Sequence, residues 1–176
     1  MARCFIGVLL TEEVKKSIES VKNELKKLPI KCKFIERENL HICLSFLGEV
    51  SEVKEISEQL EVICSNYNKF DVLVDGIKLI PSESYIRVLA LDVIDKSGSL
   101  KQIIEGIQKR IGGKFHPPHV TLCRVKNIED KTATVQKIKS VKTEDLTFNV
   151  SSIHIIKSEL RKTGPVYTSI YDVRLK

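Results

Sequence analysis

Two short segments of the sequence combine a histidine with a small hydrogen-bonding side chain at the same spacing. His41 is followed two positions later by Cys43, and His119 is followed two positions later by Thr121. Side chains alternate between the two faces of a β-strand, so in a strand each histidine shares a face with its small partner. Each segment could therefore present one imidazole and one small donor to the same space.

The residues between these positions are apolar, as expected for strands that rest on a core with one face. They are Ile42, Leu44, Val120 and Leu122. If the two strands face each other across a groove, the two imidazoles converge. One imidazole could then accept a proton from a water that attacks phosphorus, while the other protonates the oxygen that leaves in line. Histidine suits both roles because its ordinary pKa is about 6.5.

The phosphoryl oxygens in such a reaction need donors, because their charge must be stabilised through the transition state. The candidate donors are Cys43, Thr121 and Arg124. Arg124 lies five positions after His119, so strict alternation places these two side chains on opposite faces of a strand. A bulge or a strand end is required to bring Arg124 into the groove, and neither can be recognised in the sequence.

The elements that must position these residues repeat one pattern, strand–helix–strand, in the two halves of the chain. Thr11 is a suitable N-cap for the first helix, and Pro29 ends it. The segments predicted as strands are 3–10, 40–46, 70–80, 85–93, 118–125, 146–157 and 166–175, and predicted helices begin near residues 12, 52, 98 and 130. No linker rich in Gly, Pro or Ser separates the halves, which favours a single two-lobed domain over residues 1–176.

Composition narrows the class of protein. The chain has 176 residues, of which 42% are hydrophobic, and no apolar run is long enough to span a bilayer. The N-terminus has no signal-peptide pattern, so we expect a cytoplasmic protein without a membrane partner. Five cysteines without a C-x-x-C motif predict reduced thiols. The net charge of +6 is compatible with an anionic partner such as RNA, and equally with lysines on solvated helix faces.

Two motifs built around the histidines resemble the signature motifs of the two-histidine (2H) phosphoesterases. The first comprises residues 41–44 (His-Ile-Cys-Leu) with 46–49, and the second comprises residues 119–122 (His-Val-Thr-Leu) with 124–125. The resemblance is closest to the RNA 2′,3′-cyclic phosphodiesterases, also called 2′-5′ RNA ligases, and covers nearly the whole chain. It implies a bilobal α+β fold: two antiparallel sheets with pseudo-twofold symmetry around a central cleft, and helices on the outer faces.

The resemblance also implies a function: hydrolysis of a terminal RNA 2′,3′-cyclic phosphate to a 2′-phosphate without a metal or other cofactor. Relatives also join RNA ends reversibly through 2′-5′ bonds. The implied substrate is an RNA end, such as that of a tRNA fragment. The sequence does not determine the oligomeric state, and a monomer is the simplest expectation. By analogy His119 is the base and His41 the acid, while Thr121 and Arg124 bind phosphate. Cys43 stands where the family has Thr or Ser; a thiol is a weaker donor, so reduced activity is expected.

Three alternatives remain open at this point. Cys43 could mark an RNA-binding protein with weak or lost catalysis. It could act as a nucleophile, or it could form a zinc site together with His41 and His119. His116 is expected in a loop at the cleft rim, and His154 as a structural rather than a catalytic histidine. Arg87 could face the cleft or solvent, and Phe46 and Tyr167 could stack on a base or pack in the core.

Overall fold

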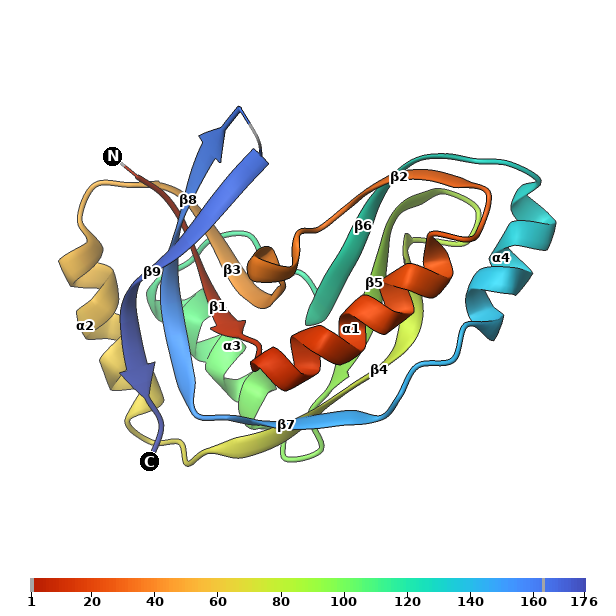
Figure 1. Ribbon diagram of the computed structural model, residues 1–176. Coiled ribbons are helices and arrows are strands. Elements are labelled where there is room, and N and C mark those ends of the chain that lie inside the picture. The colour runs from red at the N-terminus through yellow and green to blue at the C-terminus, as the bar shows by residue number, and fades with distance from the viewer. Residues whose placement is uncertain (1, 163) are drawn as a thin grey trace.

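The computed structural model describes residues 2–162 and 164–176, which form the mixed α+β fold that the sequence predicts. The strands are β1 (Ala2–Leu9), β2 (Ile30–Phe34), β3 (His41–Val50), β4 (Phe70–Pro81), β5 (Ile86–Ile94), β6 (His119–Ile128), β7 (Leu146–Val150), β8 (Ser152–Arg161) and β9 (Gly164–Arg174). The helices are α1 (Glu12–Leu25), η1 (Arg37–Asn39, a 3-10 turn), α2 (Val53–Cys64), α3 (Ser99–Arg110) and α4 (Lys131–Ser140). Figure 1 shows two lobes that diverge from a narrow junction.

The strands form one continuous antiparallel sheet rather than the two separate sheets expected. Their order is β7-β4-β5-β6-β3-β1-β8-β9, and β2 pairs with β6. Within the described residues, the two halves of the sheet pair with each other only between β3 and β6, where Ile42 and Val120 form a single residue pair. Beyond that pair each strand has other partners: β6 pairs with β2, and Phe46 on β3 pairs with Lys114. This junction is the seam of the sheet.

The segment predicted as one strand over 146–157 is two strands. β7 pairs with β4 in one half, whereas β8 pairs with β1 in the other half. The chain therefore leaves one lobe and enters the other near Ser151. Local apolar patterning could not show this change, because it depends on which distant strand supplies the hydrogen bonds. β2 is also absent from the predicted strands, and it is a short strand on the edge of β6.

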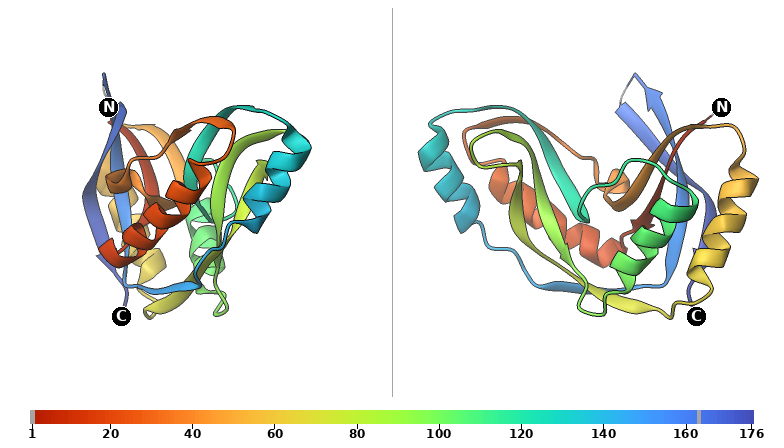
Figure 2. Two further views of the ribbon diagram at one scale, coloured as in Figure 1. Left: turned by 45° about the vertical axis from the view of Figure 1, so that its right-hand side comes forward. Right: turned by 180° about the vertical axis from the view of Figure 1, so that it is seen from behind.

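Two helices, α1 and α3, pack on the half of the sheet that does not directly precede them. α1 follows β1 but covers the lobe of β4, β5 and β6, while α3 follows β5 but packs on β3 and α2 (Figures 1 and 2). One hydrophobic cluster consequently includes buried residues of both lobes, among them Ile18 of α1 and Ile107 of α3. No helix of the described chain is long and apolar enough to cross a membrane.

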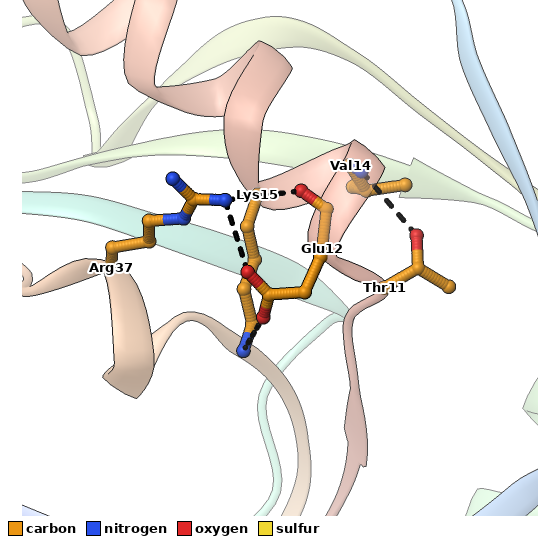
Figure 3. A network of polar contacts seen from close by, with 5 residues as sticks. All are labelled: Thr11, Glu12, Val14, Lys15 and Arg37. Atoms are coloured by element: carbon orange, nitrogen blue, oxygen red, sulfur yellow. Dashed lines mark hydrogen bonds and ion pairs between the residues drawn. The ribbon is translucent and has the colours of Figure 1, made fainter.

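The start of α1 is tied to η1, which precedes the first histidine. Thr11 caps the helix by accepting a hydrogen bond from the Val14 amide at 3.3 Å, as predicted. Glu12 in the first turn pairs with Lys15 at 3.1 Å and with Arg37 at 3.0 Å (Figure 3). Because these charges are exposed, the pairs contribute little energy. The pair between Glu12 and Arg37 nevertheless links η1 to the start of α1.

Candidate active site

The seam of the sheet places the two histidines on one face. Ile42 and Val120 are completely buried on the side of the core. Their neighbours along the strands therefore point to the opposite, open side. Continuing the antiparallel pair by one residue in each direction sets His41 opposite Thr121 and Cys43 opposite His119. The two histidines thus lie diagonally across the seam, and both line the same hollow; diagonal neighbours in a regular antiparallel pair have backbones roughly 7–8 Å apart.

A β-bulge in β6 brings Arg124 to the same face. Thr121 pairs with Ala90 of β5, but Cys123 pairs with the adjacent Leu89, so Leu122 has no partner of its own there. Leu122 and Cys123 both point into the core and are completely buried. The extra residue reverses the alternation beyond it, and Arg124 becomes exposed on the open side. This bulge is the feature that the sequence required but did not reveal.

The strand β3 carries a bulge at the corresponding position. Cys43 pairs with Gly7 and Ser45 with the adjacent Ile6, so Leu44 is the extra residue. Leu44 and Ser45 are both buried, and Phe46 is turned to the open side. β3 and β6 therefore follow the same sequence of burial after their histidines. Phe46 occupies in β3 the place that Arg124 occupies in β6.

All five predicted site residues line one hollow over the seam. The lining residues are Ile35, Asn39, His41, Cys43, Phe46, His119, Thr121, Arg124 and Tyr167. They come from β3, β6, β9, η1 and the segment between β2 and η1, and we call the space that they line the seam hollow.

Of the other candidates, Phe46 and Tyr167 line the hollow, whereas Arg87, His154 and His116 do not. Arg87 is exposed, donates to the Tyr85 hydroxyl at 2.6 Å and is not among the residues that line the hollow. His154 bonds to the hydroxyls of Ser152 and Ser169 at 2.8 and 2.9 Å, which agrees with a structural role. His116 packs edge-on against Phe46, with ring centroids 6.2 Å apart, at the rim of the site.

Each of the two histidines in the seam hollow is held in the same tautomer by the backbone. His41 Nδ1 lies 2.7 Å from the carbonyl of Asn39, and His119 Nδ1 lies 2.8 Å from the carbonyl of Pro117. A carbonyl oxygen only accepts, so Nδ1 carries the hydrogen in both rings. Nε2 is then the atom that is free to accept a proton, or to donate one when the ring is charged. Both rings are oriented for proton transfer.

Comparison with known proteins agrees with this geometry. The chain matches the family described as LigT-like phosphoesterase over residues 8–90 and 93–167. It belongs to this family. The RNA 2′,3′-cyclic phosphodiesterase of Aeropyrum pernix is 32% identical, with 81% of this chain and 85% of the relative covered. The protein of the same name from Methanocaldococcus jannaschii is 30% identical, with 96% and 98% covered.

Solved structures confirm the fold of this LigT-like phosphoesterase. TT0787 of Thermus thermophilus superposes with a TM-score of 0.78 at 22% identity, covering 98% of this chain and 97% of that one. E. coli LigT complexed with 3′-AMP superposes with a TM-score of 0.74 at 22% identity, covering 99% and 98%. The likeness runs over the entire length of the chain, so the α+β architecture is shared as a whole.

The electrostatic surroundings of the two imidazoles in the phosphoesterase differ. Burial is the main cause that lowers the pKa of both rings. The charges of His119 and Arg124 further lower the pKa of His41. The pKa of His119 is lowered by His116 and Lys78 but raised by Asp92. His119 is therefore the only one of the two that has a carboxylate acting on it.

The thiol of Cys43 is a neutral group. Burial raises its pKa to about 12, so almost no thiolate exists near neutral pH. This argues against the nucleophile hypothesis, because thiolate is the reactive form. Among the described residues no three His, Cys, Asp or Glu side chains are grouped as a metal would require. The hypothesis of a zinc site formed by His41, Cys43 and His119 thus lacks the necessary geometry.

The sequence left the role of Tyr167 open and carried no signal for Asn39, yet both residues line the seam hollow. The Tyr167 ring stands at 90° to His41 and packs on Phe5, with centroids 5.2 and 5.1 Å away, so it forms a wall of the hollow. Asn39 is buried, and its side-chain amide donates to the carbonyl of Pro165 at 2.8 Å. Asn39 thereby holds the start of β9 against η1, while its own carbonyl orients His41. Asn39 and Tyr167 come together only because two segments of the chain, joined by a hydrogen bond between residues 126 positions apart, lie in contact.

Proposed function

We propose that this phosphoesterase hydrolyses the 2′,3′-cyclic phosphate at the end of an RNA to a 2′-phosphate. The observation that carries the proposal is the pair of imidazoles on the open side of the seam, each with Nδ1 bonded to a carbonyl and Nε2 free. Several relatives that match nearly all of the chain are named RNA 2′,3′-cyclic phosphodiesterases. The net charge of +6 favours an anionic substrate.

The proposed reaction uses one ring as a base and the other as an acid. A neutral Nε2 removes a proton from water while the water oxygen bonds to phosphorus. The bond between phosphorus and the 3′ oxygen breaks on the opposite side, and the protonated Nε2 of the second ring gives its proton to that oxygen. The products are a 2′-phosphate and a free 3′ hydroxyl. Following the family, we assign His119 as the base and His41 as the acid.

The phosphoryl group would be held by donors that flank the two rings. Thr121 presents a hydroxyl next to the seam, and Arg124 presents a guanidinium that the bulge has turned into the hollow. A guanidinium forms charge-assisted hydrogen bonds to phosphate oxygens, so Arg124 would supply the main positive charge. Cys43 would contribute only a weak S–H donor.

The decisive experiment is product analysis on an oligonucleotide that ends in a 2′,3′-cyclic phosphate. We expect a 2′-phosphate product, and each of His41→Ala and His119→Ala should lower kcat about 10²–10⁴-fold. His154→Ala is the matched control, because this histidine lies outside the hollow. A protein that binds the RNA without any turnover would instead support the RNA-binding alternative. Joining of RNA ends, tRNA fragments as substrate, one two-lobed domain, the monomeric state and a cytoplasmic location remain predictions.

A further inference from the structure

A cyclic phosphate fused to ribose fixes where the attached base can go. With phosphorus between the two imidazoles, the nucleoside must enter a space that is continuous with the seam hollow. One such space, which we call the β2–β9 pocket, lies between residues 33–36 with η1 on one side and residues 164–167 on the other. It shares Ile35, Asn39, Arg124 and Tyr167 with the seam hollow. The two spaces are therefore adjoining parts of one depression.

The volumes of the neighbouring spaces favour the β2–β9 pocket as the site of the nucleoside. Its volume is about 380 Å³, within the range of roughly 300–1,000 Å³ that small-molecule sites occupy. A second space beside Phe5 and Leu9 also adjoins the hollow, but it measures only about 110 Å³. A larger pocket of about 520 Å³ near α3 shares no lining residue with the seam hollow. Of these three spaces, the β2–β9 pocket is the one that both adjoins the hollow and has room for a nucleoside.

The charges around the β2–β9 pocket match the polarity of a nucleotide. Arg124 lines both spaces and supplies positive charge where the phosphate would lie, and Lys33, its pairing partner across β2 and β6, adds positive charge to the β2–β9 pocket. Glu36 and Glu38 lie on the η1 side, and neither side chain forms an ion pair or hydrogen bond with another described residue. A free carboxylate accepts hydrogen bonds from the exocyclic amino groups of bases. Uracil has no exocyclic amino group, and its one ring N–H on that edge lies between two carbonyl oxygens that repel a carboxylate.

We infer that the β2–β9 pocket binds the nucleoside that carries the cyclic phosphate, and that Glu36 and Glu38 select bases with an exocyclic amino group over uracil. The apolar parts of Val166 and Pro165 form the wall against which the base packs. This inference rests on the proposed function, because it places the base relative to a phosphate held by the two histidines. It adds that the pocket recognises the base of the terminal nucleoside.

Base selection is tested with the four 2′,3′-cyclic mononucleotides. We expect kcat/KM for the adenosine, cytidine and guanosine compounds to exceed that for the uridine compound by about tenfold. The double substitution Glu36→Gln, Glu38→Gln should bring this ratio close to one. Glu55→Gln, an exposed carboxylate on α2, is the control and should leave the ratio as in the wild type. A ratio that is near one in the wild type, or unchanged in the double variant, overturns the selection.

Occupancy of the pocket is tested by filling it. Val166→Trp should lower kcat/KM for cyclic mononucleotides at least tenfold more than for a base-free five-membered cyclic phosphodiester. Val62→Trp, at an exposed position on α2, is the control and should not change that ratio. An equal effect of Val166→Trp on both kinds of substrate overturns the placement of the base. If the wild type turns over neither kind of substrate, the proposed function itself fails, and the two failures are thereby distinguished.

Discussion

Asp92 on β5 lies directly opposite His119 on β6, in the register that also pairs Leu91 with Val120. The carboxylate of Asp92 also pairs with Lys78 of β4, at 2.6 Å. His119 therefore faces an ion pair whose two members have opposite effects on its proton affinity. His41 has no such partner, because its neighbours are the aromatic rings of Phe5 and Tyr167 and the guanidinium of Arg124.

The first prediction concerns the dependence of kcat/KM on pH. The reaction needs one neutral and one protonated imidazole, and burial lowers the pKa of both rings below the usual value of about 6.5. At high pH the acid loses its proton, and at low pH the base becomes protonated, so the plot of kcat/KM against pH should be bell-shaped. Its maximum should lie below the usual histidine pKa of about 6.5. An optimum that lies well above neutral pH would contradict this assignment of the pKa shifts.

Substitution of Asp92 and substitution of Lys78 should shift the same limb of the pH profile, but in opposite directions. Asp92→Asn removes the charge that raises the pKa of His119, so one apparent pKa should fall. Lys78→Met removes a charge that lowers it, so the same apparent pKa should rise. The measurement is kcat/KM against pH for both variants. Identical shifts in the two variants would indicate a general disturbance of the site rather than an electrostatic effect.

The second prediction concerns Cys43. A neutral thiol with a pKa of about 12 donates weakly to a phosphoryl oxygen, whereas a hydroxyl in its place donates strongly. Cys43→Thr should therefore raise kcat/KM by up to about tenfold. Cys43→Ala should retain turnover, because no thiolate chemistry is required. Complete loss of activity in the alanine variant would restore the nucleophile hypothesis.

The third prediction separates two arginines on neighbouring strands. Arg124 is turned into the seam hollow by the bulge, whereas Arg87 is exposed and bonded to Tyr85. Removal of a donor that stabilises transition-state charge typically costs about 10²–10³-fold in rate. Arg124→Ala should therefore lower kcat/KM at least about 100-fold, and Arg87→Ala should leave it unchanged. Comparable losses in the two variants would mean that net charge, rather than position, determines the effect.

The fourth prediction concerns the backbone beside β3. Gly113 has a φ of +106°, and an added Cβ would lie 2.8 Å from the carbonyl oxygen of Phe46 and also too close to the Ser45 hydroxyl. Gly112 also has a positive φ, but its Cβ position is open. Gly113→Ala should therefore lower the free energy of unfolding by about 1–3 kcal/mol more than Gly112→Ala does. Urea unfolding of both variants measures the difference, and equal losses would show that the close approach to β3 is relieved without cost.

The sequence by itself determined the local elements and the chemistry of the two motifs. Apolar residues between the polar positions of 41–44 and 119–122 are sufficient to specify two strands with one buried face, which puts each histidine on the other face. The N-cap at Thr11 and the apolar stripe of α1 are equally local. These features depend on side-chain periodicity, which is why they could be predicted from the chain alone.

Only the tertiary structure decided how the two motifs combine. The bulge that turns Arg124 toward the hollow arises from the register with β5, a strand about 35 positions earlier, and no local pattern encodes that register. The Asn39–Pro165 contact, the wall formed by Tyr167 and the join at Ile42 and Val120 likewise depend on pairings between distant segments. The pKa values of the histidines follow from burial, which exists only after those segments have packed. Periodicity is a property of neighbours in the chain, whereas hydrogen-bond register and burial are properties of neighbours in space.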